Sequence, residues 1–194
     1  MSISTVRLVP TPPADSESVA AAFISLRLTR HASHSTETNQ PSGEEVWLTD
    51  DAETAAHWIK DELLDISYIA VRGINAAALA ESIRSELPMD DIPQLQARAI
   101  TDRDADVLID TLYRTAIVAY SGYDPQAFAL LRWGLNDPDP LIRRVSLLAV
   151  SITGWEAFSS VLDEISKQDP VEEVRDQAAR VREALKPGAG NPPM

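Results

Sequence analysis

Apolar residues recur at intervals of three and four through the C-terminal half of the chain. Phe128, Leu131 and Leu135 follow this spacing, which is that of the buried stripe of an amphipathic helix. The next segment places a second apolar set on one helical face: Ile142, Val145, Leu148, Ala149 and Ile152. The stretch 136–140 between them contains two prolines, which end one helix and are tolerated in the first turn of another. The pattern predicts two antiparallel helices joined by a short turn.

The same pattern returns 32 residues later, and we interpret it as an internal repeat because turn residues, apolar positions and a charged pair coincide together. The coinciding positions are Gly122-Tyr123 with Gly154-Trp155, Asp137-Pro138 with Asp169-Pro170, and Ile142-Arg143 with Val174-Arg175. The repeat predicts a second helix pair over 156–167 and 171–186. Periodicity alone predicts a degenerate pair before both, over 92–99 and 104–121.

This repeat resembles the HEAT repeat family. HEAT repeats carry an Asp in the turn within each helix pair and an Arg six residues later in the second helix. Asp137 with Arg143, and Asp169 with Arg175, match that motif, whereas the degenerate pair lacks it. The resemblance implies a short α–α superhelical stack over about half of the chain. It also implies that these four residues form a structural ladder between adjacent repeats, because a guanidinium can bond a carboxylate and a turn backbone together.

The N-terminal half shows a different pattern. Strands are predicted over 5–9, 45–49 and 66–71, which are rich in β-branched and aromatic residues. Helices are predicted over 51–64 and 75–87. Their expected inward residues are Ala55, Trp58 and Leu63 in the first, and Ala77, Leu79, Ile83 and Leu87 in the second. The order from residue 45 is then β-α-β-α, which indicates a small α/β layer.

Two interpretations stay open for residues 16–30. Val19 to Phe23 suit a helix, which we favour, but Ile24, Leu26 and Leu28 alternate with polar residues as in a strand. Residues 31–43 are predicted to form a polar loop and residues 187–194 a disordered tail.

The predicted fold class is therefore α+β, predominantly α. A small α/β layer over 1–88 is followed by HEAT-like helical repeats over 89–186. Three strands cannot bury both faces of a sheet without help, so we expect the helical stack to pack against the layer in one compact body.

Charge and composition narrow the classes of partner. The chain has 194 residues and a net charge of −13, and from Asp102 to the end it has 10 Lys and Arg against 15 Asp and Glu. No basic stripe for phosphates is predicted, so we expect no nucleic acid partner. Such acidity attracts basic proteins, although we favour the alternative that it only maintains solubility. Cysteine is absent, and we find neither a secretory signal nor a membrane span. We expect a cytoplasmic protein with no membrane partner.

The strongest candidate metal motif is the acidic stretch Asp102 to Asp106, which resembles the start of an EF-hand loop. That loop needs glycine at its sixth position and glutamate at its twelfth, where this chain has Val107 and Tyr113. An acidic helix start explains the stretch better, because Asp satisfies free amides and the helix dipole there.

The remaining candidates for chemistry are weaker. His31, His34 and Glu37 are zinc-ligand types, but they lie in the most polar stretch of the chain, and the third histidine, His57, is far away in sequence. Adjacent acidic pairs such as Asp50-Asp51 and Asp163-Glu164 are interpreted as helix caps and solvated faces. We predict no catalytic, cofactor-binding or metal-ligating residues and no cofactor.

The leading hypothesis is a non-enzymatic protein–protein interaction module that presents its second helices to another protein. One version is an inhibitor or immunity-type protein that binds a basic enzyme. The alternative is an enzyme accessory subunit, or a small-ligand-binding protein, that uses a cleft between the α/β layer and the stack. Trp47, Trp58 or Tyr68 could line that cleft, although core positions suit them better. We expect a monomer or a weak dimer.

Overall fold

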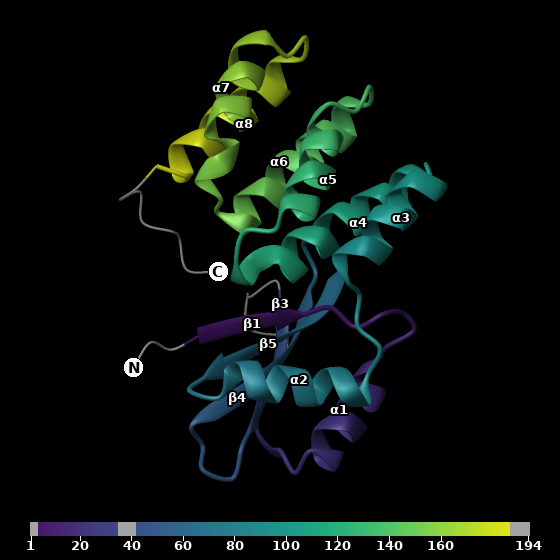
Figure 1. The fold of residues 1–194 in the computed structure, drawn as a ribbon, viewed down its shortest axis with the longest axis vertical. Helices are drawn as coiled ribbons and strands as arrows, with labels where there is room; N and C mark the ends of the chain where they lie inside the picture. Colours follow the sequence, from purple (N-terminus) through teal and green to yellow (C-terminus); the bar gives the residue numbers. More distant parts are fainter. Residues whose placement is uncertain (1–3, 35–41, 187–194) are drawn as a thin grey trace. The chain divides into compact units, whose positions relative to one another are not determined.

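The structure is a computed structural model that describes residues 4–34 and 42–186 (Figure 1). It contains five strands and eight α-helices over those residues, so the α+β, predominantly α, fold class is confirmed. The chain divides into two compact units, Met1–Asp91 and Ile92–Met194, and each is described by itself. The predicted tail and the middle of the predicted polar loop lie outside the described residues.

The first unit is an antiparallel sheet with strand order β1-β5-β4-β3-β2 and two helices (Figure 1). The strands are β1 (Ser4–Leu8), β2 (Thr29–His34), β3 (Ser42–Leu48), β4 (Thr54–Asp61) and β5 (Ile66–Gly73), and the helices are α1 (Ser16–Ser25) and α2 (Ala76–Glu86). Phe23 of α1 packs edge-on against Trp47 of β3, and Ile83 of α2 joins the same buried cluster. Trp58 of β4 belongs to it as well. Trp47 and Trp58 are therefore core residues.

The helix predicted over 51–64 is wrong, because these residues contain β4. Thr54, Ala56 and Trp58 are buried and alternate with half-buried Ala55 and His57, which is the period of two of a strand. Leu63, which the helical spacing placed inward, is 77% exposed in the turn after β4. The observed order is β3-β4-β5-α2, so the predicted β-α-β-α order is also wrong.

The predicted polar loop over 31–43 is wrong at both ends. Residues 31–34 belong to β2 and residues 42–43 to β3, and pairing with a neighbouring strand satisfies their backbones despite the polar side chains. Over 16–30, the favoured helix is confirmed as α1. It gives way to a strand after a turn in which Arg27 has φ of 60°. In α2, Ala77 is exposed, and Ala76 and Ala80 are buried instead.

The second unit consists of helices that pack pairwise in sequence order (Figure 1). They are α3 (Ile92–Thr101), α4 (Ala105–Val118), α5 (Pro125–Leu135), α6 (Pro140–Thr153), α7 (Ser159–Gln168) and α8 (Glu172–Ala184), with short 3-10 turns η2 (Ala119–Ser121) and η3 (Glu156–Phe158). The second helices α4, α6 and α8 also pack in series, while α3 packs on α5. All three predicted helix pairs are present. Leu148 is the exception to the predicted inward face, since it is exposed on α6.

Consecutive pairs are joined at the starts of their first helices by an aromatic cluster. The ring of Phe128 stacks on that of Phe158 with the ring centroids 4.4 Å apart, and the ring centroids of Tyr123 and Trp155 are 5.1 Å apart. Tyr123 and Trp155 occupy equivalent positions of the 32-residue repeat. Trp155 and Phe158 are buried in these contacts, which hold the beginning of α7 against the beginning of α5.

Gly134 sets how closely three helices approach. A Cβ atom built there would lie 2.3 Å from Ser146 Oγ of α6 and 2.9 Å from Leu112 Cδ2 of α4. Only glycine fits without displacement, so α5 is drawn against both second helices at this point.

Candidate functional site

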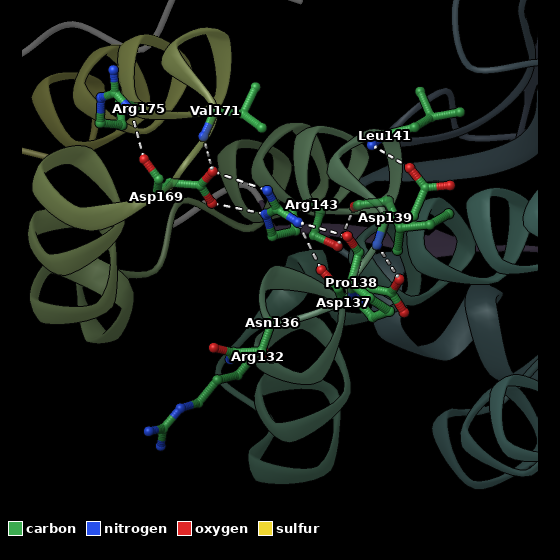
Figure 2. A network of polar contacts seen from close by, with 12 residues as sticks. Arg132, Asn136, Asp137, Pro138, Asp139, Leu141, Arg143, Asp169, Val171 and Arg175 are labelled. Carbon is green, nitrogen blue, oxygen red and sulfur yellow. Dashed lines mark hydrogen bonds and ion pairs between the residues drawn. The ribbon is translucent and has the colours of Figure 1, made fainter.

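The four residues predicted to form a ladder lie together at the ends of the first helices, and Arg143 makes the central contacts (Figure 2). Its Nε and Nη2 donate to Asp169 Oδ2 and Oδ1 at 2.8 and 2.9 Å. Its Nη1 donates to the carbonyl oxygens of Asp137 at 2.9 Å and Pro138 at 3.1 Å. Arg143 thus ties the turn of its own helix pair to the carboxylate of the next pair.

Asp169 is held in the ionised form by this environment. Burial raises its pKa, but hydrogen bonds from Arg143 and from the Val171 amide, together with the charges of Arg143 and Arg175, outweigh burial and lower the pKa below its usual value. Asp169 Oδ1 accepts the Val171 amide at 2.9 Å, which shapes the turn before α8. The carbonyl of Asp169 accepts from Arg175 Nη1 at 2.6 Å. This carboxylate therefore organises the stack.

Asp137 has the same turn geometry but a different cation. Its Oδ1 accepts the Asp139 amide at 2.9 Å, and its Oδ2 accepts from Arg103 Nη2 at 2.7 Å. Arg103 comes from the turn between α3 and α4, and its guanidinium lies 4.4 Å above the centre of the Trp133 ring. Arg103 therefore neutralises Asp137 and covers one side of Trp133 at the same time.

Sequence reasoning missed Arg103, although a signal for it was present. Asp102 Oδ1 accepts the Asp104 amide at 3.0 Å, the same loop bond that Asp137 makes to Asp139. The spacing Asp-x-Asp thus occurs before both α4 and α6. Leu108 stands six residues after Asp102, where the later pairs have arginine, so the motif was judged absent.

The candidates for other chemistry have structural roles. Asp104 caps α4 and accepts the amides of Asp106 and Val107, as expected for an acidic helix start. His57 lies on β4 with its Nδ1 2.6 Å from Glu44 Oε1 of β3. Across 4–34 and 42–186, no three His, Asp or Glu residues lie close enough together to hold a metal ion.

In two of the acidic pairs, one carboxylate has defined partners. Asp163 is contacted by Lys167 and Arg182, and the hydrogen bond from Lys167 lowers its pKa. Asp51 Oδ1 accepts from the Thr49 hydroxyl and from the Glu53 amide, which stabilises the turn between β3 and β4. Asp51 thus stabilises a turn, and Asp163 contributes to ion pairs on a helix surface.

A polar pocket of about 290 Å³ opens beside the ladder. Arg143 and Asp169 line it, but their charges already satisfy each other. Arg132 also lines it, and its guanidinium points away from the other labelled side chains (Figure 2). Among the described residues no acceptor reaches this guanidinium, so Arg132 is a cation available at the surface.

A second pocket, the α3–α5 groove, lies between these two helices and is apolar. It has a volume of about 150 Å³ and is lined by Gln96, Ala99, Ile100, Ala129, Leu130 and Trp133. Ile100 is 70% exposed and Trp133 is 38% exposed. Helices α3 and α5 contain Arg98 and Arg132 but no Asp or Glu, in a chain whose net charge is −13. Arg98 is paired with Asp110 of α4, so the feature that marks this surface is its apolar lining.

A smaller apolar surface lies on the other layer of the stack. Leu141 and Leu148 are exposed on α6, which also contains no acidic residue.

Comparison of the chain with protein-family models, curated proteins and solved structures found no match. Within the described residues, no helix is both long and apolar enough to cross a membrane.

Proposed function

We propose that this protein is a non-enzymatic protein-binding module whose HEAT-like helical unit binds another protein through the α3–α5 groove. The observation that carries this proposal is the exposure of Ile100 and Trp133 around an apolar pocket on two helices without carboxylates. Contiguous exposed apolar surface rimmed by polar groups is typical of interaction sites. Tryptophan and arginine are the residue types that most often dominate binding energy in interfaces.

The state of the polar groups supports a binding role rather than catalysis. All three nitrogens of the Arg143 guanidinium donate to protein oxygens, and Asp169 accepts from Arg143 and from a backbone amide. The hydrogen-bonding atoms of both side chains are therefore used to stabilise the turns of the stack. An interaction module needs a rigid surface, and the ladder supplies rigidity beneath the groove-forming helix α5.

The first unit supports a second mode of binding, charge-steered attraction of a basic protein. Residues 1–91 contain six Lys and Arg against fifteen Asp and Glu, a net charge of −9, whereas 92–194 have a net charge of −4. Asp50, Asp51 and Glu53 are exposed together around the turn between β3 and β4. An inhibitor of a basic enzyme would use such a region to accelerate association.

The test is an affinity pull-down from native cell extract with the wild-type chain and two matched variants. Ile100→Glu places a charge in the α3–α5 groove, and Leu148→Asp places one on the exposed face of α6. We expect a partner that the wild type and Leu148→Asp retain and that Ile100→Glu loses. A partner lost only with Leu148→Asp would move the binding surface to the second helices, and no retained protein would contradict the proposal.

Salt distinguishes the two modes. A partner bound through the apolar groove stays bound when salt is raised, because the interaction depends on buried apolar surface. A basic partner steered to the acidic unit is released, because salt screens exposed charges beyond about 10 Å. Retention at high salt together with loss in Ile100→Glu is the result that our proposal requires.

A further inference from the structure

The polar pocket beside the ladder, with a volume of about 290 Å³, is lined by one face of α5 and one face of α7, and we call it the α5–α7 pocket. The α7 wall consists of residues spaced three and four apart on one helical face: Val161, Glu164, Ile165 and Gln168. The α5 wall has the same spacing and consists of Arg132, Leu135 and the capping residue Asn136. Arg132 and Asn136 correspond to Glu164 and Gln168 in the 32-residue repeat. Equivalent positions of neighbouring helix pairs therefore line the two walls of one pocket.

The two walls carry opposite charges that do not pair with each other. Arg132 contributes a guanidinium from α5 and Glu164 a carboxylate from α7, and both residues are exposed. Arg132 extends away from the ladder (Figure 2). Within the part of the chain that the structure describes, neither side chain has a hydrogen bond or an ion pair. The pocket therefore offers one free cation and one free anion to a bound molecule.

The other charged groups that line the pocket already have partners. Arg143 is paired with Asp169, and Asp137 is paired with Arg103. These groups therefore add no free charge to the site, and the charge that a ligand meets is set by Arg132 and Glu164.

The rest of the lining includes an aliphatic surface. Leu135 is buried, and Val161 and Ile165 are half-buried. The volume lies at the lower end of the range of about 300–1,000 Å³ that is typical of ligand pockets, so a ligand must be small. A complementary ligand combines a carboxylate, an ammonium group and a short aliphatic chain.

We propose that the α5–α7 pocket binds a free α-amino acid with an aliphatic side chain, whose carboxylate bonds to Arg132 and whose ammonium group bonds to Glu164. The side chain of the amino acid packs on Leu135, Val161 and Ile165. Glu164 repels a simple anion and Arg132 repels a simple amine, whereas a zwitterion satisfies both. This site is separate from the α3–α5 groove and does not depend on the proposed binding of a protein there. Both charges are exposed to water, so the dissociation constant should be about 1 mM.

The first experiment is a titration of the full chain with L-leucine, followed by the amide chemical shifts in NMR spectra. We expect saturable shifts at amides of α5 and α7. Two analogues of leucine test the charges separately: isocaproate lacks the ammonium group, and isoamylamine lacks the carboxylate. Each should bind at least about fivefold more weakly than leucine. Unchanged α5 and α7 amides at about ten times the expected dissociation constant, or equal binding of leucine and both analogues, would overturn the inference.

Two variants assign the charges to the two walls. Arg132→Gln should remove the advantage of leucine over isoamylamine, and Glu164→Gln should remove its advantage over isocaproate. Arg180→Gln is the matched control, because Arg180 is an exposed cation on α8 outside the pocket, and it should bind leucine as the wild type does. Circular dichroism of each variant checks that it is folded. If Arg132→Gln and Glu164→Gln both bind leucine as tightly as the wild type, the inference is wrong.

Ile100→Glu separates this site from the proposed function. The variant should still bind leucine, because Ile100 lines the α3–α5 groove and not the α5–α7 pocket. Loss of leucine binding in folded Ile100→Glu would place the amino acid in the groove and refute the inference. Loss of a captured protein in Ile100→Glu bears only on the proposed function.

Discussion

Two arginine–aspartate contacts hold corresponding turns of the helical unit, and they are built differently. Arg143 contacts Asp169 with two nitrogens, and the two side chains are only 10% and 6% exposed. Arg103 contacts Asp137 with one nitrogen, and although Asp137 is 4% exposed, Arg103 is 49% exposed. The turn and the aspartate are the same in both, whereas the origin and burial of the cation differ.

The difference shows that the turn requires the aspartate more strictly than it requires a particular arginine position. A buried carboxylate must be neutralised, and either a helix residue or a turn residue can do it. Arg143, whose side chain is only 10% exposed, bonds to the two turns of the stack. Arg103, which remains near solvent, also covers Trp133 and so connects the first turn to the α3–α5 groove.

The largest expected effect is at Asp169. Asp169→Asn removes the charge that Arg143 needs and leaves that guanidinium buried without a counter-ion, so we expect the free energy of unfolding to fall by about 3 kcal/mol. Urea denaturation measures it. Asp163→Asn is the matched control, because Asp163 has two cationic partners on the surface, where water screens the charges, and its loss should cost far less stability. Equal losses in both variants would show that burial does not distinguish these contacts.

Part of the stability that Asp169 gives to the folded chain should be lost in acid. Its pKa is lower in the folded chain than its usual value of 3.8, so it stabilises the folded state above that value, and the stabilisation is lost as the pH falls through the folded pKa. We therefore expect the difference in stability between wild type and Asp169→Asn to shrink as the pH is lowered below about 4. Urea denaturation at several pH values measures it, and a difference that grows in acid would contradict the assignment.

A smaller effect is expected for Arg103→Ala, about 1 kcal/mol, because removing the half-exposed Arg103 side chain lets water reach Asp137 and partly replace the cation. This substitution should also uncover Trp133, which increases quenching of tryptophan fluorescence by acrylamide. Arg132→Ala is the control on the same surface, since Arg132 does not cover the Trp133 ring in the way that Arg103 does. Unchanged quenching in Arg103→Ala would mean that Trp133 does not depend on the cation.

The smallest effect is expected at Arg175. Its one hydrogen bond goes to the Asp169 carbonyl, so Arg175→Ala should cost about 0.5 kcal/mol, measured by urea denaturation. Arg143→Ala provides the comparison, because the same residue type one pair earlier makes four hydrogen bonds. If Arg175→Ala lowered the stability as much as Arg143→Ala, the contacts of Arg143 to the next helix pair would contribute nothing to stability.

The helical unit could be predicted from sequence because its determinants are local. Apolar spacing and turn prolines lie within each pair, and the repeat presents them twice. Its resemblance to HEAT repeats stays a prediction. The exposed Leu148 was not recognised because helical spacing does not say how wide the covered face is.

The first unit was harder, since its determinants are pairings between distant residues. Residues 51–64 contain both a helical and an alternating apolar pattern, and only pairing with β3 and β5 decides between them. β2 carries polar side chains, so no hydrophobic signal marked it. The α3–α5 groove depends on residues from two helices, and its shape could not be seen in either alone. That the stack packs against the sheet also stays a prediction.

The arrangement of Arg143 and Arg175 gives the helical stack a direction. Each arginine bonds the carbonyl of its own turn, and Arg143 reaches forward to the carboxylate of the following turn. Among the described residues, no turn follows α8 to supply a carboxylate to Arg175. The last helix pair therefore presents an arginine in the position from which Arg143 donates to Asp169. Duplication of one 32-residue segment would supply that carboxylate together with a new arginine. The protein could therefore lengthen during evolution by gene duplication, with every added copy meeting its predecessor through an existing set of bonds.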